Sequence, residues 1–209
     1  MIINNQLRHR TPVLVIMLLI LSAGNSTLKA ETMEDEKGIY LGLKFVGASL
    51  HSDNASDEEF YIKNDGGGVQ FDFGYRFNPT FSLELSLIGS SHETSDQNID
   101  AAMAGLQIFG YYRFSPERPL RPYIKGGLGG YSLQVEEGSA RVRIEGGGIA
   151  VGAGFRFFFT SHFALGVDLT HNIIRYDKGQ LTLEGFSYET SIDEEGALTT
   201  LGLTFNYSF

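Results

Sequence analysis

The chain of 209 residues contains no cysteine, which excludes disulfides, cysteine nucleophiles, thiolate zinc sites, iron–sulfur clusters and a lipidated N-terminal cysteine. Basic residues are scarce, 16 against 25 acidic ones, and the pI is near 5.0. Because nucleic-acid phosphates require a basic face, this balance argues against a nucleic-acid partner. No phosphate-binding loop, zinc-protease motif or EF-hand spacing occurs, so we expect neither a metal nor a cofactor.

Long apolar runs are also scarce, and the one at residues 13–21 is too short for a transmembrane helix, which needs about 20 residues. Two arginines precede it and small or polar residues follow it, which is the order of a secretory signal peptide. We expect residues 1–30 to be a signal peptide, cleaved after Ala30 or Gly24, and residues 31–209 to form the exported domain. Cleavage after Ala30 leaves 13 basic against 25 acidic residues.

Apolar residues recur at every second position in eight segments of the exported chain. Val69, Phe71 and Phe73 share one parity, for example, while Gln70 and Asp72 share the other. A period of two indicates a β-strand. The predicted strands cover residues 38–50, 66–77, 81–90, 102–114, 122–135, 147–159, 162–173 and 197–209.

The connections alternate between short turns and long loops. Short turns are predicted at 78–80, 115–121 and 160–161, and long loops at 51–65, 91–101, 136–146 and 174–196. This order predicts an all-β fold, a closed antiparallel eight-stranded barrel of up-and-down topology.

Glycines 146–148 predict a β-bulge, because the apolar parity switches across them, from Val142 and Ile144 to Ile149 and Val151.

Residue size indicates which face of the barrel is inside. The lumen of an eight-stranded barrel is narrow, and glycine, alanine and serine occupy the polar face while phenylalanine, leucine and tyrosine occupy the other. We therefore expect glycine on the inner wall and the apolar face toward lipid, in a transmembrane barrel rather than a soluble one. Aromatic residues predicted to form an interfacial girdle at the short-turn end are Tyr75, Phe77, Phe81, Tyr112, Phe114, Tyr123, Phe157, Phe159, Phe163, Tyr207 and Phe209.

Residues 38–209, with the segment R-P-Y-I-K-G-G-L-G-G at 121–130 and the terminal L-T-F-N-Y-S-F, resemble the OmpA/OmpX-like and opacity-like eight-stranded outer-membrane barrels of Gram-negative bacteria. The resemblance implies a monomer in the outer membrane with both termini periplasmic, in contact with membrane lipid and lipopolysaccharide. It also implies a role in envelope integrity and adhesion. In that family the last strand is similar to a signal for the barrel assembly machinery, carried here by Leu203, Phe205, Tyr207 and Phe209.

Charged residues of the polar face are predicted to pair across the lumen and close it. The alternative is a channel for small solutes or a hydrophobic ligand. These residues are Lys44, Asp72, Arg76, Glu84, Arg113, Lys125, Arg156 and Asp168. Three of the arginines lie in a repeated aromatic-Arg-Phe motif that closes the second, fourth and sixth predicted strands.

The loops at 51–65 and 174–196 are acidic. Alternating apolar residues in the second loop predict that the last two strands continue as a protruding hairpin, whose edge is available to a host-surface ligand. Alternatively, the acids are simply solvated or bridge to lipopolysaccharide through divalent cations. Candidate contact residues are Asp57, Glu58, Glu59, Phe186 and Tyr188.

A lipid A acyl-modifying enzyme is a further alternative, because some eight-stranded barrels use serine, histidine and an acid for that reaction. His51, His92 and His171 are the candidate histidines for it, but no histidine-x-serine pair occurs on a lipid-facing strand. We therefore predict no catalytic residue and no enzyme activity.

Overall fold

The structure is a computed structural model that describes residues 37–52, 62–94, 99–138, 140–183 and 186–209. The signal-peptide prediction and the candidate contact residues Asp57, Glu58 and Glu59 lie outside the described residues. Within the described ranges, no helix has the length and apolar character needed to cross a membrane.

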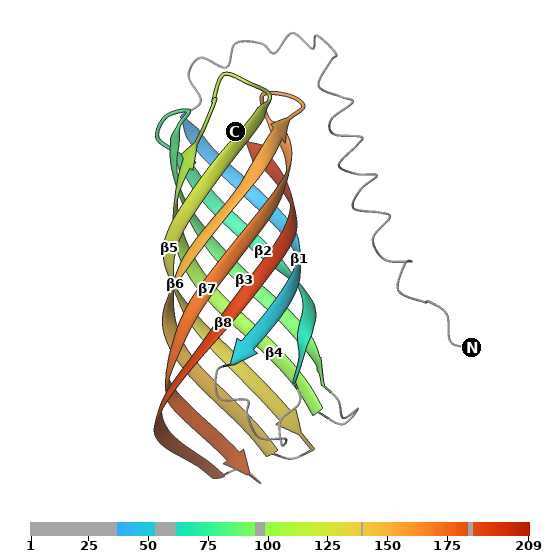
Figure 1. Ribbon diagram of the computed structural model, residues 1–209, viewed down its shortest axis with the longest axis vertical. Coiled ribbons are helices and arrows are strands. Elements are labelled where there is room, and N and C mark those ends of the chain that lie inside the picture. Colours follow the sequence, from blue (N-terminus) through green and yellow to red (C-terminus); the bar gives the residue numbers. More distant parts are fainter. Residues whose placement is uncertain (1–36, 53–61, 95–98, 139, 184–185) are drawn as a thin grey trace, which may run out of the picture. The chain divides into compact units, whose positions relative to one another are not determined.

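Eight antiparallel strands form a closed barrel, in which neighbours in sequence pair with each other and the last strand pairs with the first (Figure 1). The predicted fold class is confirmed. Closure leaves no strand edge within the barrel wall. The strands are β1 (Gly38–Ser52), β2 (Ile62–Arg76), β3 (Phe81–Thr94), β4 (Ile99–Arg113), β5 (Leu120–Glu137), β6 (Ala140–Phe158), β7 (Phe163–Leu183) and β8 (Phe186–Ser208).

One end of the barrel, here called the turn end, carries the three short connections and the residues Gly38 and Phe209. The β2–β3 turn is closed by Asn78, whose side-chain oxygen accepts hydrogen bonds from the backbone of Thr80 and Phe81 at 2.9 and 2.8 Å. Such a local bond replaces ladder partners in a tight turn. The opposite end, where β7 meets β8, is called the hairpin end.

Strands at the hairpin end run further than the sequence predicts. β7 and β8 occupy most of the predicted loop at 174–196, so the predicted continuation of the last two strands as a hairpin is confirmed. The predicted loop at 136–146 is wrong, because β5 and β6 approach each other across a short connection containing Gly138, which has a φ of 58°. Ladder hydrogen bonds extend these strands where the apolar signal has become weak.

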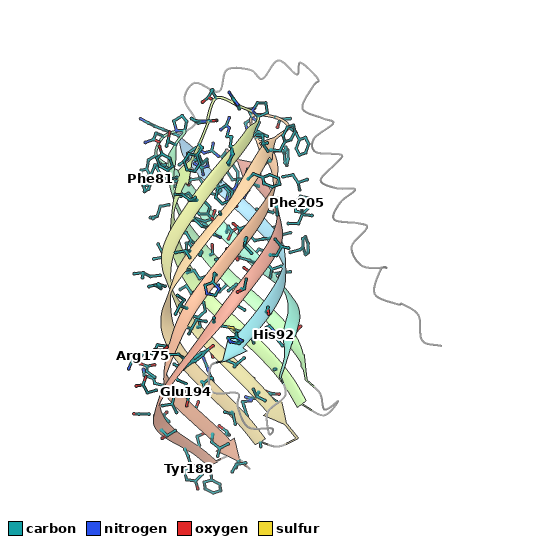
Figure 2. All side chains as sticks on the ribbon, viewed as in Figure 1. Phe81, His92, Arg175, Tyr188, Glu194 and Phe205 are labelled. Carbon is teal, nitrogen blue, oxygen red and sulfur yellow. The ribbon has the colours of Figure 1, made fainter. Side chains whose placement is uncertain are left out.

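Large apolar side chains cover the outside of the barrel, including Phe81 and Phe205 (Figure 2). The predicted aromatic girdle faces outward with one exception. Tyr123 is only 2% exposed and lies in the lumen, so its assignment to the girdle is wrong. β5 begins at Leu120, and its outward parity therefore falls on Pro122 and Ile124.

Glycine lies on both faces, and the prediction that it marks the inner wall is only partly right. A Cβ at Gly74 would overlap the ring of Tyr40 in the lumen. Gly126, Gly130 and Gly147 instead face outward, and a Cβ at Gly130 would meet nothing within 4 Å.

The predicted bulge in β6 needs a correction. The β6–β7 register does shift between Glu145 and Gly146, but the additional residue is Asp177 of β7. β6 keeps its alternation throughout, so Ile144 packs inside the barrel while Ile149 faces outward. The apolar residues change parity because they face the apolar layer inside the barrel at the start of β6 and the barrel exterior further along. The direction of successive side chains alternates regularly along the whole strand.

Candidate functional site

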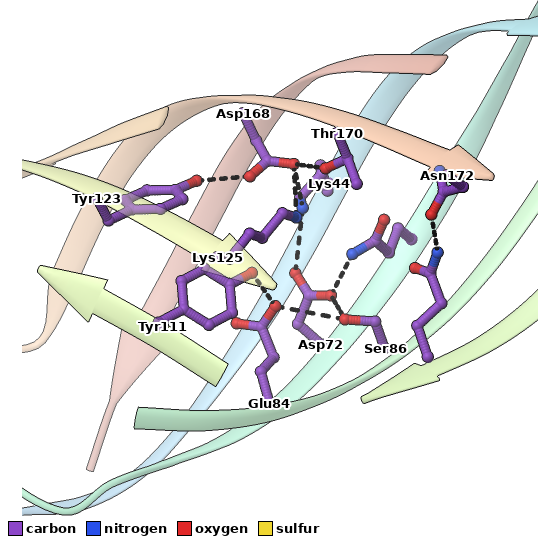
Figure 3. A network of polar contacts seen from close by, with 12 residues as sticks. Lys44, Asp72, Glu84, Ser86, Tyr111, Tyr123, Lys125, Asp168, Thr170 and Asn172 are labelled. Carbon is purple, nitrogen blue, oxygen red and sulfur yellow. Dashed lines mark hydrogen bonds and ion pairs between the residues drawn. The ribbon is translucent and has the colours of Figure 1, made fainter. Parts of the chain in front are cut away.

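The eight charged residues predicted for the lumen are all buried inside the barrel, each with at most 5% of its surface exposed. They come from β1, β2, β3, β4, β5, β6 and β7, at the inward parity of each strand. Figure 3 shows most of the contacts that join them.

Asp168 of β7 is one centre of this network. Its Oδ1 accepts hydrogen bonds from the Nζ atoms of Lys44 and Lys125, both at 2.9 Å, and from Thr170 at 2.8 Å. Its Oδ2 accepts one from the Tyr123 hydroxyl at 2.7 Å. Because Lys44 is on β1 and Lys125 on β5, a single carboxylate ties three strands together across the lumen.

Glu84 of β3 is the second centre. Its Oε2 accepts hydrogen bonds from Tyr40 at 2.8 Å and from Arg156 at 3.1 Å, and its Oε1 accepts one from the hydroxyl of Tyr111. Ser86 lies between this carboxylate and Asp72, which it reaches at 2.7 Å. Sequence reasoning did not assign Tyr40, Tyr111 and Tyr123 to this network, although they share the inward parity of the charged residues.

Four arginines gather near the turn end and are called the arginine cluster: Arg76, Arg113, Arg121 and Arg156. Three of them come from the repeated motif, and their guanidinium groups lie 5.2–6.0 Å from the ring centre of Tyr40. Cation–π attraction of this kind is strengthened by desolvation. Arg121, which stacks over Phe158 at 4.2 Å, was missed, although it shares the parity of Lys125.

An apolar layer fills the lumen toward the hairpin end, and the sequence analysis did not predict it. Its signal was present, because adjacent apolar pairs such as Leu87–Ile88 and Ile173–Ile174 place one residue on each face. Gln107 and Asn172 hydrogen-bond to each other and to the hydroxyl of Tyr131, which belongs to this layer. The buried layer comprises Val46, Ala48, Ile88, Met103, Tyr131, Ile174, Tyr176 and Leu198.

Beyond the apolar layer, β5–β8 continue as a four-stranded projecting sheet, formed by residues 133–137, 140–144, 179–183 and 186–190. Cross-strand rows of the sheet alternate in character, because paired residues face the same side. One row is Val135, Val142, Leu181 and Tyr188, and the next is Gln134, Arg143, Gln180 and Glu189. One face is therefore apolar and the other is polar.

The two described candidate contact residues lie on this sheet. Phe186 and Tyr188 are 70% and 63% exposed, and both follow the apolar rows. Arg175 of β7 donates two hydrogen bonds, of 2.8 and 2.9 Å, to Asp193 of β8 (Figure 2 labels Arg175). β1 stops pairing with β8 at Gly196, so the described residues place no strand beside the outer edge of Phe186–Asp193.

The residues of the predicted assembly signal lie on β8 at the turn end. Leu203, Phe205, Tyr207 and Phe209 all point outward, and the first three are paired with β1.

The histidines considered for catalysis lie on three different strands. The Ser90 hydroxyl and His92 Nε2 are 3.1 Å apart at the hairpin end of β3, and burial lowers the pKa of His92. Within the described residues, His92 Nδ1 has no hydrogen-bond partner, whereas a catalytic histidine needs an acid there to orient it. His171 faces outward and contacts Thr199. The described part of the chain also holds no group of three or more histidine and acidic side chains suited to a metal ion.

Comparison with known proteins agrees with this architecture. Residues 13–209 match the family model described as an outer membrane protein beta-barrel domain. No curated protein sequence matches the chain.

Solved structures with a similar fold include Neisserial surface protein A, with 16% identity over 82% of this chain and 97% of that one, at a TM-score of 0.64. OprG from Pseudomonas aeruginosa shares 14% identity over 86% and 99%, at 0.56. The attachment invasion locus protein Ail of Yersinia pestis shares 14% over 83% and 99%, at 0.52. Because these sequence identities are only 14–16%, the similarity shows a shared fold and nothing more.

Proposed function

Because the chain belongs to the outer membrane protein beta-barrel domain family, we propose that it is a surface protein of the Gram-negative outer membrane whose projecting sheet binds a partner outside the cell. In this proposal the turn end and both termini face the periplasm. Short periplasmic turns and an aromatic girdle are usual for such barrels. The names of two structurally similar proteins, a surface protein and an attachment protein, support the same kind of role.

The observation that carries the proposal is the edge of β8 from Phe186 to Asp193, beside which the described part of the chain places no strand. A strand with unpaired backbone groups is a template for an added strand. Glu189 and Glu195 are exposed beside this edge, while Phe186 and Tyr188 offer apolar contacts. The partner that fits is therefore an extended segment in which basic and apolar residues alternate.

A ten-residue peptide of alternating lysine and valine should bind the refolded full-length protein, and Glu189→Lys should weaken binding by about tenfold, the effect of about 1.4 kcal/mol. Charge reversal places like charges opposite each other, which is unfavourable. Titration calorimetry in detergent measures the affinity. Glu117→Lys, an exposed acid at the turn end, serves as the matched control and should leave binding unchanged.

Equal affinity for an alternating glutamate–valine peptide would contradict the proposed charge complementarity. A chelator tests the alternative role of the same acidic residues, which is contact with lipopolysaccharide through divalent cations. Chelation would abolish that contact and would leave peptide binding unchanged. On cells, replacing residues 177–193 with a short turn should reduce adhesion to host cells, and unchanged adhesion by a folded barrel would remove the adhesion proposal.

We also propose that the lumen is closed, because the charged network and the apolar layer fill it in succession. The refolded protein should show no steady conductance in a planar lipid bilayer. A steady conductance that disappears when Arg76 or Arg113 is replaced would instead favour the alternative function, a channel for small solutes.

A further inference from the structure

A shallow groove of about 500 Å³ lies on the outside of the barrel, where β3 to β7 run side by side. Its floor contains Gly130 of β5 and Gly147 of β6, which face outward and pair with each other. A Cβ at Gly130 would meet nothing within 4 Å, so the space above the floor is open. Leu87 and Leu106 precede the two glycines in the same cross-strand row and are 56% and 53% exposed. A ridge and a hollow therefore lie next to each other.

The groove lies where the outward side chains change from apolar to charged. Along β6 the outward positions run from Ile149 through Gly147 to Glu145 and Arg143. In barrels of this family the outward apolar band contacts lipid. The groove therefore begins within the lipid-facing band and ends at its boundary on the side of the hairpin end.

Two charges of opposite sign line the groove at this boundary. Asp177 and Lys178 follow each other on β7, and both are exposed. Within the described part of the chain, neither side chain forms an ion pair or a hydrogen bond. Glu145, which also lines the groove, is already paired with Arg143 at 2.7 Å. One free anion beside one free cation is a self-complementary pattern, because a two-fold axis can place each charge against its opposite.

We propose that this groove is the interface between two copies of the chain, related by a two-fold axis along the membrane normal. Leu106 of each copy packs over the floor formed by Gly130 and Gly147 of the other, and Lys178 of each pairs with Asp177 of the other. A pair of this kind differs from the monomer that the family resemblance implies. It involves neither the edge of β8 nor its proposed partner.

The physical setting favours a second copy over lipid as the occupant of the groove. Lipid chains are as apolar as leucine, so proteins associate within a membrane through close packing and polar contacts, and small residues allow the backbones to approach. An acyl chain would fill the hollow but would leave Asp177 and Lys178 without partners. A second copy fills the hollow with its ridge and pairs both charges.

The absence of cysteine allows a direct test by crosslinking in the outer membrane of intact cells. In a Ser132→Cys variant, which places a thiol of nearly the same size in the groove, a short bis-maleimide should join two copies. Ser49→Cys is the matched control, because Ser49 is an outward-facing serine of β1, on the opposite side of the barrel. The control should give about tenfold less dimer, since a closed two-fold pair uses one surface only.

Two charge variants in the Ser132→Cys background test the pairing. Lys178→Asp replaces both ion pairs between the copies with like-charge contacts and should lower the yield of dimer by about tenfold. Adding Asp177→Lys exchanges the two charges, which makes the surface self-complementary again and should restore the yield. Heated SDS gels measure the dimer, and unheated gels show that each variant is folded.

Equal yields from Ser132→Cys and Ser49→Cys would indicate random collision and would overturn the proposal. So would a yield that Lys178→Asp leaves unchanged, or one that the exchanged variant does not restore. If folded Ser132→Cys gives no dimer, lipid occupies the groove and the proposed second copy is wrong.

Discussion

Replacing Asp168 with alanine is expected to destabilise the folded barrel by about 3–5 kcal/mol, because it leaves Lys44 and Lys125 buried without their shared partner. The same change removes the acceptor of the Tyr123 and Thr170 hydroxyl groups. The free energy of unfolding is measured by urea titration of the protein refolded into lipid vesicles.

Asp177→Ala is the matched control, because Asp177 lies on the same strand and is exposed. Its effect should stay within about 0.5 kcal/mol. Changing Lys44 and Lys125 to methionine in the Asp168→Ala background should recover part of the loss, since apolar groups of similar volume do not need the carboxylate. If Asp168→Ala costs no more than the control, the cross-lumen network does not determine stability.

Strand positions and barrel closure were predictable because both depend on local pattern. Residues such as Phe71 and Leu85 alternate with polar neighbours, and a period of two arises directly from the pleat. The inward parity of Lys44, Asp168 and the other charged residues follows from the same alternation. Their pairing does not, because Lys44 and Asp168 are 124 residues apart and meet only through the register of the closed sheet.

The sequence of β5 does not show which face of the strand carries Tyr123. Glycines 126, 127, 129 and 130 lack the side chains that define a parity, so the inward face of this strand depends on its pairing with β4 and β6. Alternation has a second limit, since its period is the same whether the apolar face points in or out. Ile144 and Ile149 lie on one regular strand, and the surroundings decide that the first packs inside.

The two faces of β5 provide a test of this assignment at adjacent residues. Gly127→Val should destabilise the barrel by about 3 kcal/mol or more, because a Cβ there would overlap the Ile108 carbonyl oxygen and crowd the Phe109 ring. Gly126→Val should be tolerated within about 1 kcal/mol. Its nearest neighbour would be the Ala150 oxygen at 3.9 Å, and a β-branched side chain favours a strand.

The folded fraction of each variant is read from unheated samples on SDS gels, and its free energy of unfolding from urea titration. Both variants make the same chemical change one position apart, so strand propensity and hydrophobicity are matched and only the direction of the side chain differs. Equal destabilisation would mean that these residues do not alternate between lumen and lipid. A larger loss at Gly126 would mean that β5 is paired one residue out of the register described here, which would also turn Lys125 and Tyr123 away from Asp168.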